Sequence, residues 1–348
     1  MGEGLKLVVP ITAYPLPFAM LYWLTRYALA ALLLIGAMLA ASAQAQTVPL
    51  HDATVARFAT ADESRLRLGT RDAFVAAMSP YDRAARTARA GTVTEAEFLA
   101  HAAAQVLDWQ PAEITKISAL IAKISTRLKP LQLPLPEVVW FIKTTGREEA
   151  ETPYTRGNAI VLPQQYLGVA TEEMERVIIH ELFHVISRHA PDRRNALYAI
   201  VGYRDCGPLK WPPELEPRRI TNPDAPENRH CITLARGGAP LTFYPVLFAK
   251  EDAYDPRLPG SFIDRMAFQL LAVMGSGTTW TAGRAGDALV LLDAGNVPEY
   301  FNAIGLNTRY IIHPEEILAD NFIFLVRGER KVRTPKILDD LERVLVAK

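Results

Sequence analysis

Apolar residues recur at helical spacing along much of the first 130 residues. The clearest pattern lies in residues 111–128, with apolar positions at Ile114, Ile117, Leu120, Ile121, Ile124 and Leu128. This spacing places them on one face of a helix. Residues 85–90 and 94–107 are rich in Ala and predict two further helices. The pattern therefore predicts a helical N-terminal part in residues 46–130.

Short apolar runs replace this pattern beyond residue 130. Residues 131–136 combine Leu with Gln and Pro and predict a linker. Strands are predicted from four apolar runs: 138–143, 158–163, 231–235 and 241–249. The last two form a predicted hairpin that turns at Gly237-Gly238, and residues 261–274 fit either a strand or a helix. Together these elements predict an α+β fold in which residues 131–348 form one domain.

One longer apolar run predicts a buried helix in residues 171–188, and residues 192–203 predict another helix after it. The polar exceptions in the middle of the first helix are His180, Glu181 and His184. The two histidines lie four positions apart, so both imidazoles can reach one tetrahedral metal ion. Glu181 then stands beside the metal, where a carboxylate can take a proton from activated water and pass it to a leaving amine.

The stretch from His180 to His184, with uncharged residues around it, resembles the active-site helix of the zincin metallopeptidases. The resemblance implies a zinc ion bound by His180 and His184, with Glu181 as the general base. It also implies a zincin-like catalytic domain, in which a small mixed sheet lies against the active-site helix. In zincins an edge strand before this helix often pairs with the substrate, and residues 158–162 are either that strand or an ordinary one.

The ends of the active-site helix are predicted from Thr171 as its cap and Pro191 as its stop. His189 follows five residues after His184, which places it about 140° further round the helix. It should therefore point away from the metal, and we interpret it as a residue that favours the helix dipole. The metzincin pattern is excluded, because it requires Gly where this sequence has Ser187.

A second helix that carries polar residues is predicted to start at Pro314. Glu316 and Asp320 stand four positions apart on one face of this otherwise apolar helix. The arrangement is similar to the gluzincin, or thermolysin-like, branch of the family. This resemblance implies Glu316 as the third zinc ligand and Asp320 as the residue that orients a ligand imidazole. Glu315 has Ala319 at the same offset, and we interpret Glu315 as a favourable acid in the first turn.

The segment between these two helices, residues 190–312, is long for this family and is expected to hold much of the cleft. Residues 207–228 carry six prolines and predict an extended loop, either a cleft rim or a surface wrap. The gluzincin resemblance also implies a residue that stabilises the oxyanion of the reaction. His230, Tyr154 and Tyr310 are the candidates, and the sequence does not choose between them.

The N-terminus predicts an export signal. Arg26 precedes an apolar run at residues 27–41, and small residues up to Ala45 offer cleavage sites. Residues 1–45 are therefore a predicted signal peptide, with Met20 as an alternative start. The apolar run is short for a membrane span, so we expect no stable span after cleavage. A periplasmic or secreted location follows.

Charge and cysteine content narrow the function further. The chain has 38 basic and 38 acidic residues, and the missing basic excess argues against a nucleic acid as partner. Its two cysteines, Cys206 and Cys231, either form a disulfide in an oxidising compartment or remain buried thiols. Both alternatives leave the metal to histidine and carboxylate ligands.

These observations predict an exported zinc-dependent metallopeptidase with about one zinc ion per chain and a peptide or protein substrate. Peptide bonds would be hydrolysed through a metal-activated water, with Glu181 as the general base. The alternative is a non-catalytic, zinc-stabilised binding scaffold of the cell envelope. A structural site of that kind needs a fourth protein ligand, for which Asp192 or a residue of the proline-rich loop is the candidate.

Overall fold

A mixed sheet lies at the centre of the N-terminal half of the described chain. The computed structural model describes residues 46–346, and the predicted signal peptide lies outside them. The strands of the sheet are β1 (Thr47–His51), β2 (Thr54–Phe58), β3 (Val138–Thr144), β4 (Tyr154–Arg156) and β5 (Ala159–Pro163). Their spatial order is β1-β2-β3-β5-β4. The strands β2, β3 and β5 run parallel, whereas β1 and β4 are antiparallel to their neighbours.

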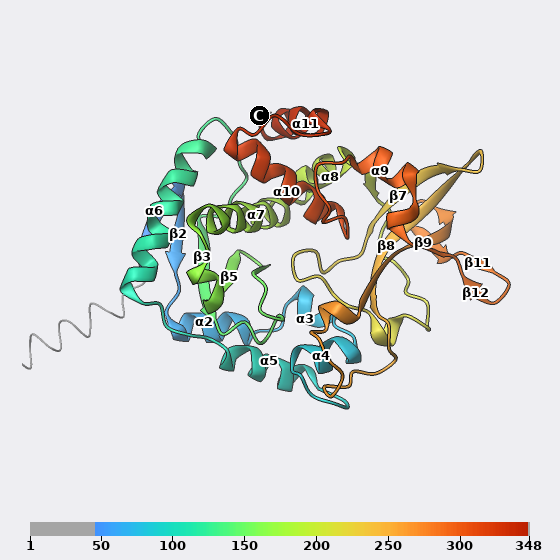
Figure 1. Cartoon of the computed structure of the whole chain (residues 1–348), viewed down its shortest axis with the longest axis horizontal. Coiled ribbons are helices and arrows are strands. Elements are labelled where there is room, and N and C mark those ends of the chain that lie inside the picture. The colour runs from blue at the N-terminus through green and yellow to red at the C-terminus, as the bar shows by residue number, and fades with distance from the viewer. Residues whose placement is uncertain (1–45, 347–348) are drawn as a thin grey trace, which may run out of the picture. The chain divides into compact units, whose positions relative to one another are not determined.

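Helices cover both faces of this sheet (Figure 1). One face carries α6 (Pro111–Leu128) and α7 (Thr171–His189), with α10 (Pro314–Arg327) packed on α7. The other carries α2 (Ala61–Leu68), α3 (Ala73–Ala77) and α5 (Glu95–Ala104). Phe141 and Ile160 belong to the first core. Their chain neighbours Ile142 and Val161 belong to the second, as the alternation of a strand requires. Burial on both faces explains why these strands are apolar at nearly every position.

A second, antiparallel sheet is built from the long segment between α7 and α10. Its strands are β6 (Tyr203–Asp205), β7 (His230–Arg236), β8 (Ala239–Ala249), β9 (Met266–Ser276), β10 (Thr279–Ala282) and β13 (Leu291–Leu292). A small ribbon adds β11 (Arg284–Ala285) and β12 (Ala288–Leu289). The predicted hairpin is confirmed as β7 and β8, and Gly237 and Gly238 both have positive φ at its turn. Residues 261–274, which fitted either a strand or a helix, mostly belong to strand β9.

The region before residue 130 contains strands as well as helices. Helix α6 covers the predicted residues 111–128, and α5 lies within the predicted 94–107. The helix predicted for residues 85–90 is wrong, because α4 (Pro80–Arg86) ends there. Strands β1 and β2 were not predicted, and both pair within the first sheet. The mixed α+β class is thus observed, while a division at residue 130 stays a prediction.

The ends of the central helices follow from local chemistry, with two corrections. Thr171 is the first residue of α7 and not its cap, since Ala170 holds the cap position without a side-chain hydrogen bond. Helix α8 (Pro191–Ala199) stops before the predicted residue 203, because Gly202 turns the chain with a φ of 80°. The shorter helices α9 (Pro298–Ile304) and α11 (Pro335–Val346) complete the set.

A disulfide joins Cys206, directly after β6, to Cys231 on β7 of the second sheet. Both residues are fully buried in a small core formed by the faces of β8 and β9. Disulfides persist in oxidising compartments, so the bridge points to an exported protein. Among the helices of residues 46–346, none has the length and apolar character needed to cross a membrane.

Candidate metal centre

Three side chains from α7 and α10 converge at the point where these helices pack together. The Nε2 atom of His180 lies 3.1 Å from Oε2 of Glu316, and Nε2 of His184 lies 3.6 Å from the same oxygen. A tetrahedral zinc ion with bonds of about 2.0–2.1 Å places its ligand atoms about 3.3 Å apart. The two nitrogen–oxygen distances are therefore compatible with a zinc site, and the three ligand atoms all lie within 4.8 Å of one another.

An unsatisfied nitrogen supports the fit of a metal to this site. His184 is fully buried, and its Nε2 atom makes no hydrogen bond within the described part of the chain. Leaving a buried polar atom without a partner costs free energy. A bound cation would satisfy this nitrogen, so the donor set of two imidazoles and one carboxylate suits zinc.

Carboxylates hold the opposite side of each imidazole. Nδ1 of His180 lies 3.2 Å from Oδ1 of Asp320, as the sequence predicts. Nδ1 of His184 lies 2.9 Å from Oε1 of Glu315, which the sequence interpretation missed. Such contacts fix the tautomer that donates from Nδ1 and leave Nε2 free for a metal.

Glu315 is therefore not the favourable surface acid that the sequence suggested. Its side chain is fully buried and also accepts hydrogen bonds from the hydroxyls of Ser187 and Tyr198. The available signal was the mostly apolar stretch that follows on α10, in which Asp320 and Asn321 are the only polar residues between positions 317 and 326. A helix that is apolar all round is buried from its first turn, so an acid in that turn needs partners.

Burial and neighbouring charges shift the pKa values of two carboxylates in opposite directions. Burial raises the pKa of Glu181 to about 7, although the charge of His180 opposes it. Thr155 Oγ1 donates a hydrogen bond of 2.8 Å to Oε2 of Glu181 and orients it. Burial acts on Glu316 as well, but His184 and His180 hold its pKa at about 2. Glu316 is thus anionic and can serve as a metal ligand, whereas Glu181 can exchange a proton near neutral pH.

The proline-rich loop contacts the candidate metal centre. This contact favours the interpretation of the loop as a cleft rim over a surface wrap. Asn222 Nδ2 donates a hydrogen bond of 2.6 Å to Oε1 of Glu316. The Asp224 carboxylate lies within 4.8 Å of ligand atoms of Glu181 and His184. Neither residue was predicted individually, because loop residues carry no periodic signal. Asp192, the other proposed fourth ligand, is an exposed residue near the start of α8.

The three oxyanion candidates lie in different surroundings. The Tyr310 ring stacks on His180, with ring centroids 6.1 Å apart. Tyr154 donates to Glu148 from within the first sheet, and His230 bonds Asn195 through Nε2. Of the three, the structure brings Tyr310 to the candidate metal centre.

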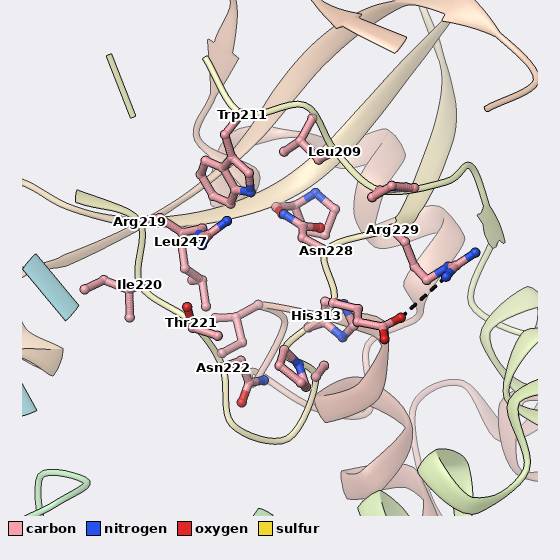
Figure 2. Close-up of a pocket in the computed structure, with 16 residues that line it drawn as sticks. Leu209, Trp211, Arg219, Ile220, Thr221, Asn222, Asn228, Arg229, Leu247 and His313 are labelled. Atoms are coloured by element: carbon pink, nitrogen blue, oxygen red, sulfur yellow. Dashed lines mark hydrogen bonds and ion pairs between the residues drawn. The ribbon is translucent and has the colours of Figure 1, made fainter. Parts of the chain in front are cut away.

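Two hollows border the site. The first, of about 310 Å³, is lined by His180, Glu181 and Tyr310. The second, of about 290 Å³, lies beside the proline-rich loop and includes Asn222 and His313 among its lining residues (Figure 2). Asn222 links this second hollow to Glu316 through its amide. The site is thus accessible to a small ligand.

The strand expected to pair with substrate is not at the edge of the sheet. Residues 158–162 fall on β5, which lies between β3 and β4. The short strand β4 adds outside it and forms the edge. That expectation was wrong because the three residues of β4 carry too little pattern to be predicted as a strand.

Comparison with known proteins adds no relative. No family model, no curated protein sequence and no solved structure matches the chain. The geometry of this site is therefore the main indication of what the protein does.

Proposed function

We propose that the protein is an exported zinc metallopeptidase of the gluzincin type, with a zincin-like catalytic domain. One observation carries the proposal: the Nε2 atoms of His180 and His184 converge with Glu316 while carboxylates hold both Nδ1 atoms. Glu181 lies beside this ligand set and keeps a proton-exchanging carboxylate there. A buried site used only for structure has no need for such a group.

The residues divide the reaction between them. When bound, zinc would polarise the substrate carbonyl and make a water molecule easier to deprotonate. Glu181 accepts the proton of the attacking water and then gives it to the leaving amine. We assign the oxyanion donor to Tyr310, and the stacking of its ring on His180 supports this choice. Asp320 and Glu315 keep the two imidazoles in position.

The export part of the proposal has two independent supports. The predicted signal peptide occupies residues 1–45, and the Cys206–Cys231 disulfide fits an oxidising compartment. A periplasmic or secreted location is consistent with both.

The proposal is tested by replacing Glu181 with Gln in purified mature protein. We expect Glu181→Gln to retain about one zinc ion per chain and to lower peptide hydrolysis by about 10²–10⁴-fold, since it removes the proton acceptor. Glu172→Gln is the matched control, because this exposed acid lies in the first turn of the same helix. Unchanged hydrolysis in Glu181→Gln would contradict the mechanism.

A second candidate is a non-catalytic zinc-stabilised scaffold, and Asp224 is the observation that favours it. Its carboxylate is close enough to His184 to be considered as a fourth protein ligand. Four protein ligands would close the site to water. If the protein is such a scaffold, its zinc-loaded form hydrolyses no peptide, and Asp224→Asn lowers its affinity for zinc. If it is a peptidase, Asp224 does not bind the metal.

A further inference from the structure

The outward-facing residue of the edge strand β4 already uses its backbone N–H and carbonyl in hydrogen bonds within the protein. Thr155 donates its N–H to Oδ1 of Asp224 over 2.6 Å. Its carbonyl oxygen accepts a hydrogen bond from Nη1 of Arg188 over 3.3 Å. In an antiparallel pair, alternate residues face the neighbouring strand, so Thr155 is the one residue of this three-residue strand that faces outward.

An extended polypeptide therefore cannot add to the sheet at this edge. Strand addition needs a free N–H and a free carbonyl on the edge strand. Both groups of Thr155 are bonded within the protein. Thr155 also orients Glu181, so the blocked position lies directly beside the candidate catalytic carboxylate.

The blocking segment is a turn, residues 222–225, and it is anchored. Ala225 donates its N–H to the Asn222 carbonyl, which closes the turn around Pro223. Nη2 of Arg188 donates to the carbonyls of Pro223 and Asp224 over 2.8 and 2.7 Å. These hydrogen bonds and the restricted backbone of Pro223 hold the turn in place, so the turn blocks this end of the site.

Asp224 places a carboxyl group on this turn, and burial raises the pKa of that carboxyl well above its usual range. Within residues 46–346, no Lys or Arg forms an ion pair with it, and Arg188 contacts its backbone carbonyl instead. The Glu181 and Glu316 carboxyl groups lie close by and oppose its ionisation. A carboxylate withdrawn from water is stabilised by a cation, so this end of the site suits a positively charged ligand group.

We propose that the site acts at the amino terminus of a peptide, with Asp224 binding the α-ammonium group. The inference rests on the proposed peptidase function and names its substrate class. The turn at residues 222–225 stops the substrate at its first residue. Along a peptide the α-nitrogen lies about 2.5 Å from its own carbonyl carbon, which suits an anchor this close to the ligand set.

The reaction then releases one amino acid at a time. The C–N bond after the first residue breaks, the hydroxyl of water joins the carbonyl carbon, and the proton passes through Glu181 to the new amine. The remaining peptide would lie in the hollow of about 310 Å³ lined by His180 and Tyr310. This volume is near the lower end of small-ligand sites, about 300–1,000 Å³, and suits a short substrate stretch.

The test uses one short peptide in three forms with zinc-loaded mature protein, and mass spectrometry identifies the products. We expect the free peptide to lose its first residue, N-acetylation to slow cleavage at least about 100-fold, and C-terminal amidation to have no effect. Internal cleavage of the acetylated peptide at an equal rate would overturn the inference and leave the peptidase proposal standing. If zinc-loaded protein cleaves none of the three, the peptidase proposal itself fails.

A variant separates the anchor from a metal ligand. Asp224→Asn keeps an oxygen for the Thr155 N–H, so the turn is retained. We expect kcat/KM for the free peptide to fall about 100-fold while zinc affinity stays within a factor of about three. Glu227→Gln, at an exposed acid of the same loop, should leave both unchanged. Loss of zinc from Asp224→Asn would identify Asp224 as a ligand and overturn the inference, as would unchanged kcat/KM.

Discussion

Two buried groups of charged side chains contact the proline-rich loop, and they differ in whether an arginine pairs with their acids. The arginine cluster (Asp82, Arg86 and Glu149) contains its own cation: Arg86 pairs with both acids and also donates to the carbonyl of Thr221. The Phe74 and Phe262 rings lie within 5.0 Å of its guanidinium. The acids of this cluster are thus paired with a permanently charged guanidinium.

The candidate metal centre has the opposite character. Its acids outnumber its two imidazoles, and the acids are Glu181, Asp224, Glu315, Glu316 and Asp320. Nε2 of His184 has no hydrogen bond within the described residues, although the side chain is fully buried. The comparison teaches that burial of charge is not itself a sign of function. A site with more acids than imidazoles and with an unsatisfied ring nitrogen can accept a cation.

Removing the internal cation should have the largest effect on stability. Arg86→Met leaves Asp82 and Glu149 buried without a cation, and we expect the free energy of unfolding to fall by about 3–5 kcal/mol. Urea denaturation of the metal-free protein measures the change. Arg89→Met is the control, since its pair with Glu97 is exposed and should contribute less than about 1 kcal/mol. A loss for Arg86→Met as small as the control's would break the comparison.

A third histidine sharpens the contrast between carboxylate and amide partners. His230 bonds the amide oxygen of Asn195, and burial lowers its pKa to about 4. In the unfolded chain this histidine binds a proton near pH 6.5, whereas in the folded protein it stays neutral until about pH 4. Its neutral form therefore contributes fully to the free energy of unfolding above pH 6.5, and this contribution is lost as the pH falls towards 4.

The size of this effect follows from a variant without the titrating group. Between about pH 6.5 and 4, wild type should lose up to about 3 kcal/mol relative to His230→Gln. Urea midpoints of both proteins across this range measure the difference, and shared contributions from the metal centre cancel. A difference that does not change with pH would show that His230 titrates normally.

The smallest expected effect tests the acid that orients His184. Glu315→Gln keeps the side-chain volume but weakens the hold on Nδ1 of His184, so zinc affinity should fall about 10–100-fold. Competition with a chelator measures the affinity. Glu173→Gln on the exposed side of α7 serves as control. Equal zinc affinity in Glu315→Gln and wild type would show that Glu315 does not orient His184 for metal binding.

Local periodicity explains which parts of the fold were predictable. Helix α6, strand β3 and the β7–β8 hairpin have long or repeated apolar patterns, and their predicted ranges agree with the structure to within one or two residues. Strands β1, β2 and β4 have at most five residues each, too few for an apolar pattern to define a strand, and β2 also takes its place in the sheet by pairing with the distant strand β3. No local pattern carries that information.

The same distinction applies to the candidate site. His180 and His184 share one helix face with Glu181 next to them in sequence, and Glu316 and Asp320 share a face of another helix. Spacing and the gluzincin resemblance together suggested both groups. Their meeting across 132 positions (316 minus 184) is a property of the packing of α7 on α10. Asn222, Asp224 and Glu315 escaped prediction because their roles depend on contacts between distant segments.

The central claim is that His180, His184 and Glu316 hold a zinc ion that leaves one position for water. Zinc K-edge X-ray absorption of the purified mature protein tests it most directly. We predict about one zinc per chain, bound by two imidazoles and two oxygen ligands at about 2.0–2.1 Å, with no sulfur ligand. Protein that retains no zinc, or zinc whose ligands include no imidazole, would contradict the claim.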